Sequence, residues 1–298
     1  MIEKGKLILS PQAGFGNRMR MLCSGIVLAE VLGREPLYYW PGGEASRSNT
    51  LDHIRAMREE GFHAFFLLNQ GFMPIDLNPS VKIDLSLSEW LPGEFWYPYQ
   101  SSAHQAWEGL PQQRLGAEAD ELRRFDDLQT ILIESSRALT LHDYTRSEWH
   151  AMMTQTYQAY FQPQTIYQEI LAEVPYFDMG VAIRRREFMH YFPETAQSEE
   201  ELSRWLDQII EAQAVTSLVL FSDDHALRDR FRHRLQKRGI NCPDLRWGEL
   251  KRWQVSFLEF LTLATRVSDV IYGTVKSSFA EQAAIYGGVP YAPICKNK

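Results

Sequence analysis

The segment Gly14-Phe15-Gly16-Asn17-Arg18 combines two glycines with two side chains that can donate hydrogen bonds. It lies between a short apolar run, Leu7 to Ser10, and a stretch from Met19 to Glu30 in which apolar residues recur at helical spacing. A strand, a glycine turn and a helix direct backbone N–H groups and the positive end of the helix dipole toward an anion. The turn lacks the third glycine of a dinucleotide fingerprint and the Gly-Lys-Ser/Thr of a P-loop. A tight connection is the simpler interpretation, but Asn17 and Arg18 add donors at the helix start and favour an anion-binding turn.

A run of arginines, Arg184-Arg185-Arg186, with Glu187 after it, follows the apolar run Val181-Ala182-Ile183. Such a run is usually a solvated face of the protein. Arginines at the carboxyl end of an apolar strand, however, lie where open α/β sheets bind ligands, and their planar fork matches phosphate oxygens. If the strand continues through the run, Arg184 and Arg186 point one way and Arg185 the other. We expect at least one of these arginines to bind a phosphate.

Two serines, Ser277 and Ser278, precede a short helical pattern near the end of the chain. Ser278 and Glu281 have the spacing of a capping box, which by itself explains the serine. The start of a serine-capped helix after a strand is also a phosphate site, because the backbone N–H groups that the cap does not use remain available. The two interpretations are compatible.

Polar residues also follow the apolar run that ends at Phe221. These are Ser222, Asp223 and Asp224. We expect Asp224 to cap the next helix, since an acidic side chain at that place complements the helix dipole. For Ser222 and Asp223 the sequence allows two roles, a structural one and hydrogen bonding to a ribose or a base.

The elements that must position these residues alternate regularly in the second half of the chain. Expected strands there are 181–183, 218–221 and 270–272, and expected helices are 164–174, 198–214, 224–238, 257–265 and 279–286. Strands that alternate with helices predict a parallel sheet covered on both faces. The first half mixes strand-like runs at 7–10, 37–40, 64–68, 81–85, 129–134 and 138–142 with less regular helices, among them 50–60 and 147–161. We expect an α/β protein with two domains, 1–160 and 161–298.

Composition narrows the class of protein. A chain of 298 residues with a net charge of −7 is a poor general binder of nucleic acid. Its 3 cysteines are too few and too scattered for a disulfide framework, which favours a reducing, cytoplasmic setting. Neither a secretory signal nor an apolar run of about 20 residues is visible, so we expect no membrane span, although attachment to a membrane surface stays open. His-Glu-x-x-His and Asp-x-Asp patterns are missing, and we expect no metal.

Taken together, the polar segments resemble motifs of the fucosyltransferase superfamily that includes the nodulation fucosyltransferase, the core N-glycan fucosyltransferases and the protein O-fucosyltransferases. Residues 14–18 are similar to the first glycine-asparagine loop of the family, and residues 180–187 to its His-x-Arg-Arg-x-Asp motif. Residues 220–224 resemble the second motif, and Ser277-Ser278 with Glu281 the serine-bearing third motif. The segments keep the order of the family along most of the chain.

This resemblance implies a GT-B-like architecture, in which two Rossmann-like domains face each other across a cleft. Residues 161–298 would bind the nucleotide-sugar and residues 1–160 would form the acceptor side. The implied function is an inverting, metal-independent glycosyltransferase that transfers fucose from GDP-fucose, its donor substrate, to a glycan or another hydroxyl. Arg185, or else Arg184, would hold the β-phosphate. Ser278 and its helix start would assist, and Asn17 would lie near the junction of sugar and phosphate.

The chain departs from the family pattern at three points. Ala182 stands in place of the motif histidine, and Glu187 stands in place of the aspartate. The helix around Glu259 offers no clear counterpart of the acidic residue with which the family recognises the base. Glu187 and Glu44 are carboxylates beside the two loops that could take the proton of the acceptor hydroxyl.

Three other functions stay open. One is a nucleotide-dependent oxidoreductase with an atypical fingerprint, and another is a transferase of a different sugar on the same fold. The third is a non-catalytic nucleotide-sugar-binding protein, for which Ala182 and Glu187 are the motivating departures. The acceptor itself is not identified, although the aromatic interval from Trp90 to Trp107 and the loop from Phe188 to Thr195 could shape its site. The oligomeric state is not indicated.

Overall fold

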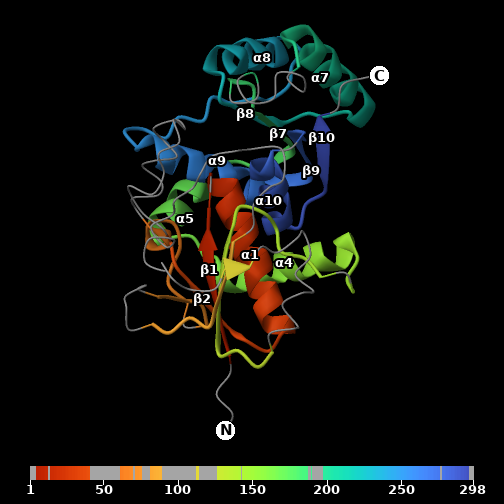
Figure 1. Cartoon of the computed structure of the whole chain (residues 1–298). Coiled ribbons are helices and arrows are strands. Elements are labelled where there is room, and N and C mark those ends of the chain that lie inside the picture. Colours follow the sequence, from red (N-terminus) through yellow and green to blue (C-terminus); the bar gives the residue numbers. More distant parts are fainter. Residues whose placement is uncertain are drawn as a thin grey trace. The chain divides into compact units, whose positions relative to one another are not determined.

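The computed structural model describes residues 5–12, 14–40, 61–69, 71–75, 81–88, 112–113, 126–141, 143–186, 189, 197–275 and 277–294. The chain divides into two compact units, which we call unit 1 (Met1–Gln164) and unit 2 (Thr165–Lys298). Each unit contains its own sheet, and all the strands paired in these two sheets are parallel. The expected α/β class is therefore confirmed (Figure 1).

Unit 1 is built on a six-stranded sheet with the order β3-β2-β1-β6-β4-β5. The strands are β1 (Lys6–Pro11), β2 (Glu35–Tyr38), β3 (Met73–Pro74), β4 (Leu85–Ser88), β5 (Gln112–Gln113) and β6 (Thr130–Ser135). Its described helices are α1 (Phe15–Val31), a 3-10 turn η2 (Phe62–Ala64) and α4 (Arg146–Tyr160). The expected strand at 7–10 and the expected helices after the glycine turn and at 147–161 are found, and the expected helix at 50–60 lies outside the described residues.

Helix α1 lies in the core of unit 1. The helix is apolar and buried over most of its surface, which requires neighbours on several sides. The thiol of Cys23 contacts the carbonyl oxygen of Met153 in α4 at 3.2 Å. The hydroxyl of Ser24 accepts the N–H of Leu139 at 2.8 Å. The middle of α1 is therefore held against α4 and against the segment after β6.

Of the strands expected in unit 1, two are absent and two are shifted along the chain. Residues 64–68 form no strand, because Phe62, Phe65 and Phe66 come together at helical spacing in an aromatic cluster with Phe161. Residues 138–141 form no strand either, since that segment is bonded to α1 through Leu139 rather than to a sheet. The strands expected at 37–40 and 81–85 are found at β2 and β4, shifted along the chain because their pairing with β1 and β6 sets the register.

Unit 2 alternates strands and helices as expected. After α5 (Thr165–Ala172) come β7 (Phe177–Ile183), α7 (Glu199–Gln213), β8 (Leu218–Ser222), α8 (His225–Lys237), α9 (Arg252–Arg266), β9 (Val267–Thr274), α10 (Ser278–Gly287) and β10 (Tyr291–Ile294). The sheet order is β10-β9-β7-β8. Ser198 and Glu201 form the capping box at the start of α7, and Ala214 ends that helix in a left-handed conformation. Strand β10 was not expected from the sequence, and α9 begins five residues before the expected start at 257.

Alternate residues of β7 face the two helix layers of unit 2. Met179, Val181 and Ile183 pack in one core cluster with residues of α7 and α8. Gly180 faces the other layer, where a Cβ atom would approach a side-chain carbon of Leu263 in α9 to 2.7 Å. The period of two along a strand thus decides which helix layer each residue after Ile183 can reach.

Candidate functional site

The arginine segment follows β7 instead of extending it, which corrects the expectation that the arginines lie on the strand. The strand ends at Ile183, and Arg186 already has helical conformation. The N–H of Arg184 donates to the hydroxyl of Thr274 at the end of β9, at 2.9 Å. The N–H groups of Arg185 and Arg186 both donate to Oδ1 of Asp223, at 2.7 and 3.2 Å. The two neighbouring strands therefore hold the arginine segment in place at the carboxyl edge of the sheet.

Arg184 and Arg185 reach opposite helix layers, as the strand alternation predicts. The guanidinium carbon of Arg184 lies 4.6 Å from the ring centroid of Phe279, in the first turn of α10. A guanidinium over an aromatic ring makes a cation–π contact that orients its plane. Arg185 turns to the other side, where Nη1 donates to Oδ2 of Asp224 at 2.8 Å. Its Nε is buried and has no hydrogen-bond partner among the described residues.

Asp224 has two structural partners. It is the N-cap of α8, as expected, and its Oδ1 accepts the N–H of Leu227 at 3.1 Å. Its other carboxylate oxygen accepts the bond from Arg185. Burial raises the pKa of Asp224, but the bonds from Leu227 and Arg185 outweigh that effect and keep the pKa below its usual range. Asp224 therefore stays ionised and fixes the orientation of the Arg185 fork.

The structure assigns local roles to the two residues that the sequence left open. The hydroxyl of Ser222 accepts the N–H of Asp224 at 3.1 Å. Asp223 accepts the two N–H groups of the arginine segment. Both residues thus shape the turn that connects β8 and α8 to the arginines, and these bonds explain why the short polar stretch follows the strand directly.

The start of α10 differs from the sequence expectation. Ser277, rather than Ser278, is the N-cap, and its side chain makes no capping bond. The N–H of Ser277 donates to the carbonyl of Thr274 at 2.9 Å, so the chain turns into the helix one residue early. Ser278 is then the first helical residue, and the expected capping box between Ser278 and Glu281 is wrong. The first four N–H groups of any helix have no acceptor within the helix. At the start of α10 the side chain of Ser277 does not act as an acceptor for them.

Glu259 is a carboxylate whose role sequence reasoning missed. It lies on α9 and is partly buried. Burial raises the pKa of Glu259 to about 7, although the charges of Arg184, Arg228 and Arg252 lower it. Asp223 adds a smaller upward effect on the same pKa. Glu259 thus belongs to the group of charges around the arginine segment, although it is distant from that segment in the sequence.

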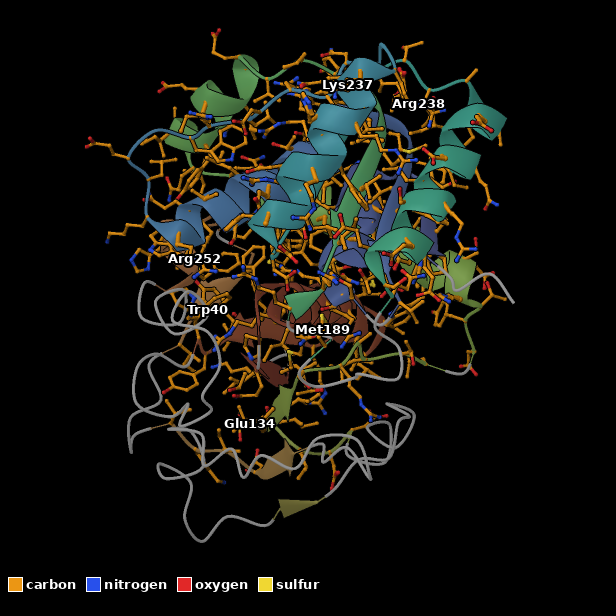
Figure 2. All side chains as sticks on the ribbon, turned by 90° about the horizontal axis from the view of Figure 1, so that it is seen from above. Trp40, Glu134, Met189, Lys237, Arg238 and Arg252 are labelled. Carbon is orange, nitrogen blue, oxygen red and sulfur yellow. The ribbon has the colours of Figure 1, made fainter. Side chains whose placement is uncertain are left out.

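Two further cations of this group were not singled out from the sequence. Arg228 lies on α8. Arg252, which is labelled in Figure 2, begins α9. Both act on Glu259 and on His225, the first residue of α8. Burial and then the charges of Arg228 and Arg252 lower the pKa of His225. Several arginines therefore gather with carboxylates at the carboxyl edge of the unit 2 sheet, and a helical spacing pattern alone could not have joined these residues.

The glycine segment of unit 1 forms the start of α1. Gly14 is the N-cap in extended conformation, and the first helical bond runs from the N–H of Arg18 to the carbonyl of Gly14 at 3.0 Å. The N–H groups of Gly16 and Asn17 precede that bond. Oδ1 of Asn17 accepts a bond from Nη2 of Arg20 at 3.0 Å. The backbone geometry expected from the glycine pair is present.

Arg18 does not extend outward from this helix start. Its side chain is only 1% exposed, and its guanidinium carbon lies 4.6 Å from the ring centroid of Trp40, after β2. A stacked and buried guanidinium links α1 to the segment after β2. The Arg18 side chain therefore packs inside unit 1, against Trp40, near the start of α1.

Some residues of interest lie outside the described part of the chain. Glu187 and Glu44, the two carboxylates considered as bases, are among them, as are Trp90 to Trp107 and most of Phe188 to Thr195. Within the described ranges, no group of three or more histidine, cysteine, aspartate or glutamate side chains could hold a metal ion. No described helix is both long enough and apolar enough to cross a membrane.

The fold of the chain is similar to that of several solved fucosyltransferase structures. No protein-family model and no curated protein sequence matches it. A variant of Arabidopsis thaliana FUT1 in complex with GDP superposes with a TM-score of 0.62 and 10% identity, over 100% of this chain and 72% of that one. POFUT1 in complex with GDP-fucose gives a TM-score of 0.58 and 11% identity, over 97% and 98% of the two chains. The α-1,6-fucosyltransferase NodZ, soaked with GDP-fucose, gives 0.57 and 14%, over 95% and 93%.

NodZ from Bradyrhizobium is similar in the same way, with a TM-score of 0.53. The likeness covers both units and confirms, at the level of the fold, the resemblance that the motifs indicate. The chain is thus an α/β protein with the GT-B-type fold of these transferases.

Proposed function

We propose that the protein is a glycosyltransferase that binds GDP-fucose in unit 2 and transfers fucose to a hydroxyl group, without a metal and with inversion at the sugar carbon. The observation that carries this proposal is the arginine pair at the carboxyl edge of the unit 2 sheet. Arg184 and Arg185 are fixed there by bonds from both neighbouring strands and by their own side-chain contacts. The shared fold with fucosyltransferases supports the same assignment.

The chemistry of the leaving group explains the need for these cations. When the bond between fucose and the diphosphate breaks, negative charge builds on the β-phosphate. Arg185 is the first candidate to stabilise that charge, because Asp224 holds its fork through Nη1 and leaves Nη2 for phosphate oxygens. Arg184 and the N–H groups at the start of α10 offer a second set of donors. Two such sets can neutralise a diphosphate without a metal ion.

Base recognition is assigned to Glu259 in this proposal. Guanine presents an N1–H and an exocyclic amino group on one edge, and a carboxylate accepts both. Glu259 is a carboxylate of unit 2 that is partly accessible and close enough to Arg184 for their charges to interact. The sequence shows no clear counterpart of the acidic base-recognition residue of the family in this helix, and it is the interaction of Glu259 with the arginine segment that makes Glu259 the candidate. Glu259 would thus take over specificity for guanine in a chain where Ala182 replaces the motif histidine.

A non-catalytic nucleotide-sugar-binding protein is the second candidate. Ala182 favours it, because this residue is buried in β7 and presents no polar group where the family motif has a histidine. Binding of the donor would then persist without turnover. Measuring binding and turnover separately distinguishes this protein from a transferase.

The first experiment is a thermal-shift panel with the full chain. We expect GDP to raise the melting temperature well above UDP, ADP or NADPH at equal concentration, because binding to the native state stabilises it by mass action. Release of GDP from GDP-fucose is then followed, since water can replace the acceptor. A larger shift with NADPH than with GDP would overturn the proposal in favour of an oxidoreductase. Binding of GDP without any release of GDP from GDP-fucose would favour the non-catalytic protein.

A further inference from the structure

The face of β7 that packs against α9 carries small residues near its carboxyl end. A Cβ atom on Gly180 would meet the side chain of Leu263 in α9, and Ala182 follows two residues later on the same face of the strand. Ala182 is buried and has no hydrogen-bonding side chain. Glu259 lies one helical turn before Leu263 on α9. A second polar group beside Glu259 must therefore come from an element other than β7.

Arg228 supplies such a group from α8. It lies in the first turn of this helix, where its N–H donates to the carbonyl oxygen of the N-cap Asp224 at 3.0 Å. Helix α8 follows β8, which is the edge strand of the four-stranded sheet. Burial raises the pKa of Glu259, and among the charges that lower it the charge of Arg228 ranks second, after that of Arg184. A helix at the edge of the sheet thus places a guanidinium near the carboxylate of α9.

The guanidinium of Arg228 keeps its hydrogen-bond donors available. Its side chain is partly exposed, and Nε lies 3.5 Å from Oδ1 of Asp229, an oxygen that also has Nη2 of Arg232 at 3.4 Å. Nε of Arg228 is buried and donates no hydrogen bond to any residue that the structure describes. Its two terminal nitrogens donate none to the described residues either. A buried donor without an acceptor is costly, so this side chain favours a ligand that supplies acceptors.

Glu259 is the complementary group. Within the described ranges its carboxylate makes neither a hydrogen bond nor an ion pair, although the charges of Arg184, Arg228 and Arg252 act on it. A carboxylate needs donors and a guanidinium needs acceptors. One ligand that carries donors on one edge and acceptors on the neighbouring edge would therefore satisfy both side chains.

We infer that Arg228 binds O6 and N7 of the guanine base while Glu259 binds N1–H and the exocyclic amino group. This inference rests on the proposed function, and it adds a specificity-determining residue in a chain where Ala182 replaces the motif histidine. The arginine fork matches the two acceptors of guanine, which lie side by side. Adenine carries an amino group in place of O6, so it would oppose one N–H of Arg228 with another. Uracil has no N7.

The test is a calorimetric titration of the full chain with GDP, ADP and UDP. We expect Arg228→Ala to bind GDP about tenfold more weakly or worse, as is typical for loss of a bidentate contact to guanine, and to bind ADP and UDP as the parent does. The matched control is Arg234→Ala, which removes the same charge from the same helix, where Arg234 pairs with Asp207 of α7. This control should keep all three parental affinities. Arg228→Lys should lose most of the preference for GDP, because the charge remains but the planar fork does not.

A second measurement changes the ligand instead of the protein. In 7-deaza-GDP a carbon replaces N7, which removes one acceptor of the proposed contact. The parent should bind 7-deaza-GDP more weakly than GDP, whereas Arg228→Ala should bind the two equally. If the alanine variant does not fold, Arg228→Met replaces it, since an unbranched apolar side chain covers the same surface as the arginine stem.

The outcomes distinguish the two proposals. A parent protein that binds GDP no better than ADP or UDP would overturn the proposed function, and this inference with it. A parent that prefers GDP, together with a folded Arg228→Ala variant that keeps this preference, would overturn the role of Arg228 alone. An equal loss of affinity for all three nucleotides would also overturn it, in favour of a contact between Arg228 and the diphosphate.

Discussion

The two sheets of this protein end in opposite chemistry. Unit 1 has a buried carboxylate, Glu134, whose Oε1 accepts hydrogen bonds from Ser10 and Gln12. Unit 2 has a pair of arginines, of which Arg185 is oriented by the carboxylate of Asp224. In both sheets the oriented group is held by a side chain from the adjacent strand or from the turn after it. Two parallel sheets therefore end differently, one in a hydrogen-bonded carboxylate and the other in an arginine segment, depending on which few side chains follow the apolar core.

The largest effect is expected at the arginine segment of unit 2, which we call the cationic edge (Arg184 and Arg185). Replacing Arg185 with alanine should lower the rate of GDP release from GDP-fucose by about 10²–10³-fold, the usual loss for one donor to a developing charge. Arg185→Lys should also lose much of the rate, since the charge remains but the planar fork does not. Steady-state rates, together with circular dichroism to verify folding, measure this.

Arg184→Ala is the companion variant at the same edge. It removes the guanidinium that stacks on Phe279 and leaves the Arg185–Asp224 pair intact. If Arg184→Ala is far slower than Arg185→Ala, the β-phosphate role passes to Arg184. Parental rates in both variants would remove the cationic edge from the mechanism.

The packing of the two units can be compared through two helical glycines. A Cβ atom on Gly287 of α10 would lie 2.1 Å from the backbone carbonyl oxygen of Ala264 in α9, which cannot yield without moving a helix. A Cβ on Gly25 of α1 would instead meet the flexible end of the Leu9 side chain at 2.6 Å. We expect Gly287→Ala to destabilise the protein by roughly 1–3 kcal/mol and Gly25→Ala by less. Urea unfolding measures the free energy of unfolding of both variants. Equal losses would contradict the prediction that the α9–α10 contact tolerates an added methyl group less well than the α1–β1 contact.

The pH dependence of nucleotide binding tests Glu259 at the cationic edge. Its carboxyl group can accept both N–H groups of guanine only when it is ionised, and burial raises its pKa to about 7. As the pH falls through that value, protonation should weaken GDP binding, by about tenfold between pH 8 and pH 6. Glu259→Gln should bind GDP less tightly at pH 8 and lack this part of the pH dependence. Calorimetric titration at several pH values decides, and identical pH profiles for parent and variant would exclude Glu259.

The smallest expected effects are the stability changes that follow removal of two N-cap hydroxyl groups. One of these hydroxyls makes a capping bond and the other does not. In unit 1 the hydroxyl of Thr145 accepts the N–H of Glu148 in a complete capping box. In unit 2 the side chain of Ser277 makes no capping bond at the start of α10. Thr145→Ala should cost about 1 kcal/mol of stability, whereas Ser277→Ala should cost close to nothing. Denaturant melts test this, and a comparable loss for Ser277→Ala would mean that its hydroxyl serves the fold.

Local patterns in the sequence predicted unit 2 better than unit 1. The alternation of strands and helices, the capping box of Ser198 and the N-cap Asp224 depend on residues that are close along the chain, and each is found in the structure. The short strands of unit 1 were predicted less well, because pairing partners set their bounds. Phe62, Phe65 and Phe66 show the same limit, since an aromatic cluster with distant residues turns a strand-like run into a 3-10 turn.

The sequence by itself determined the chemical groups and the elements that could carry them: a glycine turn before a helix, arginines after a strand, serines before a helix. Only the tertiary structure decided which of these groups meet. Ser10 and Glu134 are 124 positions apart, and Arg185 and Asp224 are 39 apart. No local pattern encodes such pairs, because parallel strand order and register bring them together. Burial of Glu259 among arginines arises in the same way, since its surroundings come from β7, α8 and α9.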